Sequence, residues 1–121
     1  MYVSKSIYST GDVVAYSDRR LKENIIDISN PMDIIMNLRG VYFNRIDDPE
    51  KKRNVGFIAQ EVEEILPEVV TYAEDVDEYG VAYGNITGVL VEAVKEQQKT
   101  IESQQKEIDE LKEMVKKLLN K

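Results

Sequence analysis

Residues 90–118 read LVEAVKEQQKTIESQQKEIDELKEMVKKL, and this stretch decides the architecture of the 121-residue chain. Its apolar residues recur in alternating steps of four and three, which is the heptad spacing of a coiled coil. Position a is occupied by Val94, Ile101, Ile108 and Val115, and position d by Leu90, Gln97, Gln104, Leu111 and Leu118. A long C-terminal helix that associates with copies of itself is therefore predicted. β-Branched residues at a with leucine at d favour a two-stranded coiled coil, that is, a dimer. This rule does not say which oligomeric state the glutamines at d favour.

The composition limits which functions are available to the rest of the chain. With no cysteine and no histidine, the sequence excludes disulfides, thiol catalysis, a Ser-His-Asp triad and the usual zinc sites. Residues 91–121 are electrically balanced, so the whole net charge of −7 falls in residues 1–90. Such an acidic surface repels nucleic acid. No apolar run approaches a membrane span, so we expect a soluble chain without an export signal, a membrane partner or a cofactor.

Between Leu21 and Gly88 the sequence predicts a small mixed domain. Apolar residues at helical spacing from Leu21 to Ile28 indicate a short helix, and Asn30-Pro31 begins a better one that ends at Gly40. The further expected elements are a hairpin of residues 41–46 and 55–58, a helix over 58–66 stopped by Pro67, and strands at 69–73 and 81–83. The predicted fold class is α+β, with the long helix at its C-terminal end.

Two acidic clusters are candidates for metal or acid–base chemistry. Glu61, Glu63 and Glu64 are best interpreted as the solvated face of a helix. The segment from Glu74 to Glu78 resembles half a calcium loop but lacks the glycine and the distal glutamate that such a loop needs. We therefore expect no metal site.

Residues 1–16 mix valine, isoleucine and tyrosine with small polar residues around Thr10-Gly11-Asp12, which predicts short strands joined by a turn. The segment has too little apolar surface to fold alone. We expect it to belong to something larger upstream.

Ser17 and Lys22 follow this segment and are candidate catalytic residues. A serine hydroxyl needs a neighbouring base to become a nucleophile. A lysine acts as that base only when neutral, which requires burial or nearby positive charge to lower the pKa of an amine from about 10.4. Arg19 and Arg20 are close enough in sequence to supply such charge.

The spacing of the two residues demands a turn. Five residues apart, they would not share a helical face, and in a strand they would lie about 17 Å apart. A turn at Asp18-Arg19 is therefore required to bring them together. The alternative is that Ser17 or Asp18 only caps a helix while Lys22 faces water.

Three features together resemble one known family. They are the segment from Thr10 to Ile25 (TGDVVAYSDRRLKENI), the segment from Gly56 to Val62 (GFIAQEV) followed by Leu66-Pro67-Glu68, and the terminal coiled coil. This order is similar to the C-terminal intramolecular chaperones of phage tail spikes and fibres, of which the endosialidase tailspike is the type case. A related domain occurs in the myelin regulatory factor.

The resemblance implies an autoproteolytic serine peptidase domain that assists a viral fibre to trimerise and fold and then cuts itself off. It implies that Ser17 and Lys22 form a catalytic dyad, and that the chain is a homotrimer, against the two-stranded preference of the heptads. Residues 1–16 would end the fibre passenger, 17–88 would form the chaperone and 89–121 the trimerisation helix. The chain would be made in the host cytoplasm as part of a tail-fibre precursor of the virion, and the chaperone would be absent from the mature fibre after cleavage.

The scissile bond can be argued from ring size. Attack of Ser17 Oγ on the Tyr16 carbonyl forms a five-membered ring, which favours cleavage between Tyr16 and Ser17 by an N→O shift. A cut between Ser17 and Asp18, using water or a serine of a neighbouring chain, is the alternative. Two other functions stay open: a non-cleaving trimeric interaction module, and the same processing domain in a cellular membrane-tethered transcription factor.

Overall fold

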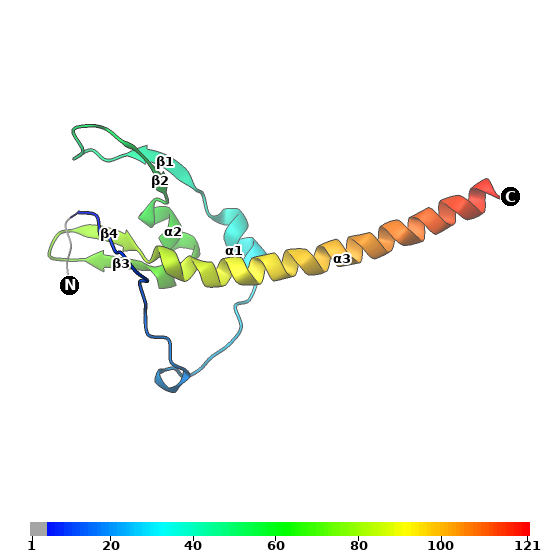
Figure 1. The fold of residues 1–121 in the computed structure, drawn as a ribbon, viewed down its shortest axis with the longest axis horizontal. Coiled ribbons are helices and arrows are strands. Elements are labelled where there is room, and N and C mark those ends of the chain that lie inside the picture. Colours follow the sequence, from blue (N-terminus) through cyan, green and yellow to red (C-terminus); the bar gives the residue numbers. More distant parts are fainter. Residues whose placement is uncertain (1–4) are drawn as a thin grey trace.

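The computed structural model describes residues 5–121, which form a small α+β body and one long helix that projects from it (Figure 1). The helix α3 spans Ile86–Leu119 and carries the C-terminus far from the body. The body comprises residues 31–85 and the first turns of α3. The predicted α+β class is confirmed.

The first half of the body is a helix followed by a hairpin. Helix α1 (Pro31–Asn37) begins with proline at its first position, where no backbone N–H is needed, and packs against α3. Strands β1 (Val41–Asn44) and β2 (Arg53–Gly56) then pair antiparallel, with Val41 opposite Gly56. The predicted hairpin is present; β1 is shorter than expected, and β2 begins and ends two residues earlier than expected.

The second half repeats this plan. Helix α2 (Ala59–Ile65) ends before Pro67, which opens a 3-10 turn, η2 (Pro67–Val69). Strands β3 (Val70–Ala73) and β4 (Glu78–Val81) form a second two-stranded antiparallel sheet. A final 3-10 turn, η3 (Tyr83–Asn85), leads directly into α3. The predicted strand at 81–83 is thus placed too late, because β4 ends at Val81.

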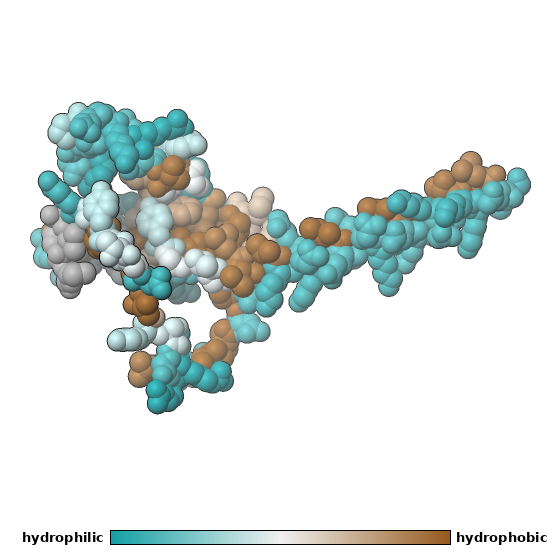
Figure 2. Space-filling model, viewed as in Figure 1, coloured by the Kyte–Doolittle hydropathy of each residue, from teal (hydrophilic) through white to brown (hydrophobic). Residues whose placement is uncertain are grey.

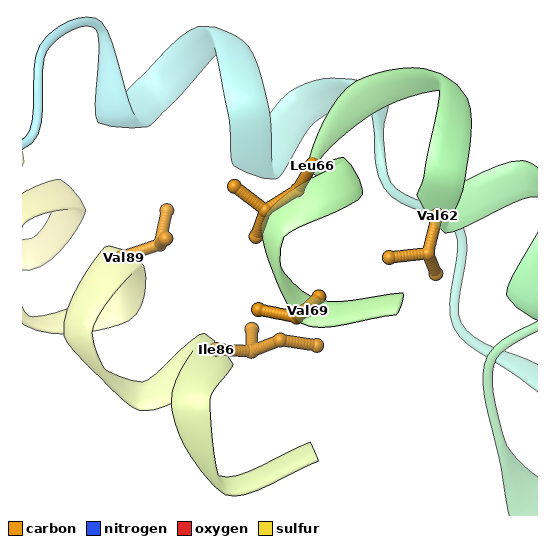
Figure 3. Close-up of a cluster of buried hydrophobic side chains, with 5 residues drawn as sticks. All are labelled: Val62, Leu66, Val69, Ile86 and Val89. Carbon is orange, nitrogen blue, oxygen red and sulfur yellow. The ribbon is translucent and has the colours of Figure 1, made fainter. Parts of the chain in front are cut away.

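A small apolar core joins α2, η2 and the start of α3 (Figure 3). Its buried members are Val62, Leu66, Val69, Ile86 and Val89. Partly buried residues of α1 and its C-cap, of the β3–β4 sheet, and Phe57 just after β2 pack around them, namely Ile34, Ile35, Leu38, Phe57, Val70 and Val81. Since so few side chains are fully buried, each contributes a large share of the stability of the body.

The hairpin β1–β2 is joined at Gly56 and Phe57 to Tyr83 of η3, the turn that precedes α3. The backbone N–H of Phe57 donates to the Tyr83 hydroxyl at 3.0 Å, and the two rings pack with centroids 5.7 Å apart. A Cβ at Gly56 would collide with the Tyr83 hydroxyl and lie 3.3 Å from the Phe43 ring. Only glycine allows this close approach.

Replacing Ile86 by alanine is expected to lower the free energy of unfolding by about 2–5 kcal/mol, because the deletion leaves a cavity in the core. Ile86 is 4% exposed, whereas Ile46 near the β1–β2 turn is 94% exposed. The matched Ile46→Ala variant should therefore stay within about 0.5 kcal/mol of the parent. Urea unfolding at one fixed protein concentration measures both; equal losses in the two variants would contradict the core described here.

Helix α3 uses two different faces. Near its start, Ile86, Val89 and Ala93 are buried against the body. Further along, the predicted heptad residues form an exposed apolar stripe, visible as brown patches along the projecting helix in Figure 2. Ile101 is 56% exposed and Leu118 66% exposed in the single chain. The predicted long helix is confirmed, and it begins four residues before the heptad pattern does.

The N-terminal part of the chain differs from the sequence-based expectation. Residues 5–16 form no strand, and the remainder of the predicted strand region, residues 1–4, lies outside the described residues. A strand needs a partner to take up its backbone hydrogen bonds, and nothing in residues 5–121 pairs with this segment. The predicted helix from Leu21 to Ile28 is also absent: the chain is irregular there, and Asn24 adopts a left-handed φ of 54°.

Candidate active site

The structure brings Ser17 and Lys22 into direct contact. Lys22 Nζ donates a hydrogen bond to Ser17 Oγ at 2.6 Å. The contact is produced by a 3-10 turn, η1 (Arg19–Leu21), in which the backbone N–H of Leu21 donates to the Asp18 carbonyl and that of Lys22 to the Arg19 carbonyl, each at 3.1 Å. The turn required by the spacing is therefore present, and it folds the lysine back over the serine.

Asp18 holds this turn from its N-terminal end. Its Oδ1 accepts a hydrogen bond from the backbone N–H of Arg20 at 2.8 Å, which is the contact of an N-cap. The Arg20 guanidinium binds the same carboxylate through Nε and Nη2, the latter at 2.7 Å from Oδ2. These side-chain and backbone hydrogen bonds from Arg20 hold the pKa of Asp18 below its ordinary value. The carboxylate thus stays ionised at neutral pH, and the arrangement is lost only as the pH falls through the lowered value.

The turn lies at the far end of an arm that leaves the body before α1 (Figure 1, blue). Every residue from 5 to 30 is exposed, including Tyr16 at 96% and Leu21 at 79%. No helix or strand of the body covers Ser17 or Lys22. In the single chain the candidate site is open to water.

The predicted site residues fall into two separate groups. Tyr16, Ser17, Asp18 and Lys22 meet at the turn, whereas the nine heptad residues lie along α3. The spacing left open where the arginines point, and the structure shows that Arg20 directs its guanidinium to Asp18. That Asp18 binds Arg20 was not predicted from the sequence. The pattern that could have indicated it is a carboxylate and an arginine two residues apart, directly after Ser17.

Two of the other acidic candidates, Glu61 and Asp77, form contacts within the body. Glu61 of α2 forms a bidentate ion pair with Arg39, 2.7 Å from Oε2 to Nη2, which links α2 to the segment after α1. This pairing holds the pKa of the Glu61 carboxyl below its ordinary value. Asp77, in the β3–β4 turn, accepts a hydrogen bond from the Tyr72 hydroxyl. Both contacts stabilise the body.

Chemically, the turn offers a hydroxyl nucleophile and an amine within the distance at which a general base works, about 2.6–3.2 Å. Among residues 5–121 there is no group of three or more acidic side chains placed to hold a metal ion. None of the helices in that range is both long and apolar enough to cross a membrane.

Comparison with known proteins assigns the class of domain. Residues 17–71 match the family profile Peptidase_S74, described as "Chaperone of endosialidase", which is a family of self-cleaving peptidase domains. The match begins at Ser17 itself. The family resemblance inferred from the sequence is therefore confirmed.

The chain is also similar to one particular fibre protein, the long tail fiber protein Gp37 of Salmonella phage S16. The two are 34% identical over 113 residues, which cover 87% of this chain. The chain spans only 15% of the length of that relative. Its resemblance is thus to one segment of a much longer fibre protein.

Proposed function

We propose that this chain is the auto-processing chaperone of a phage tail fibre, which assembles three fibre chains and then releases itself by cutting at Ser17. The observation that carries the proposal is the 2.6 Å contact between Lys22 Nζ and Ser17 Oγ at the first residue of the family match. The similarity to a phage long tail fibre supports the nature of the passenger. Residues 1–16 would then end the passenger, 17–88 form the chaperone and 89–121 the trimerisation helix.

The proposed reaction uses the neutral amine of Lys22 as general base. It takes the proton of the Ser17 hydroxyl while Oγ bonds to the Tyr16 carbonyl carbon. The bond from that carbon to the Ser17 nitrogen then breaks, and the nitrogen receives the proton from Lys22, which leaves an ester between Tyr16 and Ser17. Water, deprotonated by Lys22, adds to the ester, and Ser17 Oγ recovers a proton as the Tyr16 carboxylate departs. Cleavage between Ser17 and Asp18 is the alternative route.

Assembly is proposed to complete the site. In the single chain the dyad is exposed, whereas a lysine that acts as a general base must be neutral, a state that burial favours. The exposed apolar stripe of α3 provides the means to bring chains together, and the apolar residues of the arm around the turn provide surface for them to cover. Packing of three copies would remove water from Lys22. Cleavage would then follow only correct assembly.

Intact mass measurement on the whole 121-residue chain at neutral pH tests this function directly. We expect two fragments, with the larger beginning at Ser17, and no fragments from a Lys22→Met chain, whose unbranched side chain is one atom shorter and has no base. General-base removal is worth about 10²–10⁴ in rate. A larger fragment beginning at Asp18 would establish the alternative bond.

Two further results would each reject part of the proposal. Equal cutting of the Lys22→Met chain would remove Lys22 from the mechanism. An uncut parent chain that is nevertheless a trimer by light scattering would support a non-cleaving interaction module instead.

A further inference from the structure

Asp18 and Lys22 flank the 3-10 turn η1, Asp18 as its N-cap and Lys22 as its C-cap. They carry opposite charges and are four residues apart in the sequence, so an ion pair between them would compete with the contact between Lys22 and Ser17. In the structure they do not pair. Lys22 binds Ser17, and the Asp18 carboxylate receives all of its side-chain contacts from Arg20.

We propose that Arg20 is a positioning residue that occupies the Asp18 carboxylate and thereby keeps Lys22 free to serve Ser17. This inference rests on the proposed function of the dyad. An ammonium held by a carboxylate keeps its proton to a higher pH and is turned away from the serine. Arg20 prevents both effects, because the two oxygens of Asp18 are taken by its backbone N–H and its guanidinium.

The geometry suits arginine in particular. Nε lies 3.0 Å from Oδ1 and Nη2 lies 2.7 Å from Oδ2, so the planar fork satisfies both oxygens at once. A lysine in its place would offer a single point charge and leave one oxygen available. The fork also lies outside the turn, with the Arg20 side chain 88% exposed, so it blocks Asp18 without covering Ser17.

No other charged group in the described residues forms an ion pair with Asp18 or Lys22. The remaining charged groups on the turn and beside it are Arg19 and Glu23, both exposed and neither with a recorded ion pair. Asp18 and Lys22 are both exposed, and neither forms an ion pair or a side-chain hydrogen bond with a residue of the body. Whether Lys22 forms an ion pair therefore depends on whether the Asp18 carboxylate is already bound by Arg20.

The test compares Arg20→Ala with Arg20→Ala/Asp18→Asn. Denatured, uncut full-length chain is refolded by dilution across a series of pH values, and the rate of fragment formation is followed by mass spectrometry. Arg20→Ala frees Asp18 to bind Lys22, so we expect cleavage about tenfold slower at neutral pH, with the profile moved up by about one pH unit. Adding Asp18→Asn removes the competing charge but retains an amide oxygen that can cap the turn. The double variant should therefore cut faster than Arg20→Ala alone.

The chain contains a matched control. Arg45 and Asp47 form an ion pair at the same two-residue spacing, with Nε 3.0 Å from Oδ1 and Nη2 3.1 Å from Oδ2, in the β1–β2 connection. Arg45→Ala should leave the rate and the pH profile unchanged. If Arg20 served only to stiffen the turn, Asp18→Asn would give no recovery and the profile of Arg20→Ala would not move, and the inference would be wrong.

A second readout does not depend on cutting. In Ser17→Ala chains, which are uncut by design, NMR follows the titration of the Lys22 side chain, identified by its absence from a Lys22→Arg sample. We expect the midpoint to rise when Arg20 is replaced by alanine and to fall back when Asp18→Asn is added. An unchanged midpoint would overturn the inference even if the parent chain cleaves, whereas failure of the parent to cleave would reject only the proposed function.

Discussion

A chain carrying Ile101→Asp and Ile108→Asp is expected to be monomeric and to remain uncut. Both residues are at position a of the heptads and lie on the exposed stripe of α3. In a coiled coil these positions are buried, and each unpaired carboxylate placed there costs several kcal/mol, repeated in every copy. Two such layers remove the force that brings the chains together. Without neighbours to cover it, Lys22 stays exposed to water, which is not the environment that a lysine needs to act as a base.

The measurements are light scattering for the oligomeric state and intact mass for the cut. Lys99→Asp/Lys106→Asp is the matched control, since these residues occupy the outer position f at the same seven-residue separation. The control alters the net charge more than the test variant does, yet it should still assemble and cleave. Undiminished cutting by a monomeric Ile101→Asp/Ile108→Asp chain would show that the dyad works without assembly.

Replacing Ser17 by alanine is expected to abolish cleavage while leaving assembly intact. The change deletes the nucleophile and removes the 2.6 Å partner of Lys22, but Ser17 is exposed and contributes nothing to the core. The variant should therefore match the parent in light scattering and in urea unfolding. Continued release of residues 1–16 from this variant would exclude Ser17 as the nucleophile.

Hydroxylamine provides a check on the bond that is cut. It attacks esters, so in the favoured route it would capture the Tyr16–Ser17 ester of the parent chain and leave residues 1–16 with a C-terminal hydroxamate. The Ser17→Ala chain cannot form this ester and serves as the control. Release of a hydroxamate-free fragment ending at Ser17 would establish the other bond.

Regular elements with strong periodic patterns were predictable from the sequence. Apolar residues spaced alternately four and three apart predicted α3, and Asn30-Pro31 predicted the start of α1. The start of α3 was placed too late because Ile86 and Val89 point into the body, on a different face from the heptad stripe. The first turns of α3 follow the spacing of residues buried against the body, and the rest of the helix follows the heptad spacing. The heptad pattern is longer, so it was the one recognised in the sequence.

The arm could not be predicted in the same way. Residues 5–16 have the composition of strands, but pairing depends on a partner that residues 5–121 do not contain. At the site, the sequence predicted that Ser17 and Lys22 need a turn between them. It did not predict that Arg20 binds Asp18, although a guanidinium is attracted to a carboxylate and repelled by an ammonium, and its fork matches both oxygens of Asp18.

Because the turn lies on an exposed arm, cutting of the chain and departure of the domain from the passenger can be separate events. Residues 5–16 are exposed throughout, and their only recorded side-chain hydrogen bonds join Ser9 and Gly11. In the single chain, severing the chain at Ser17 would therefore break no side-chain hydrogen bond between residues 5–16 and the core around Val62 or α3. The cut would leave the buried core of the single chain in place. After the cut, departure of the domain would depend on the strength of its non-covalent contacts with the passenger.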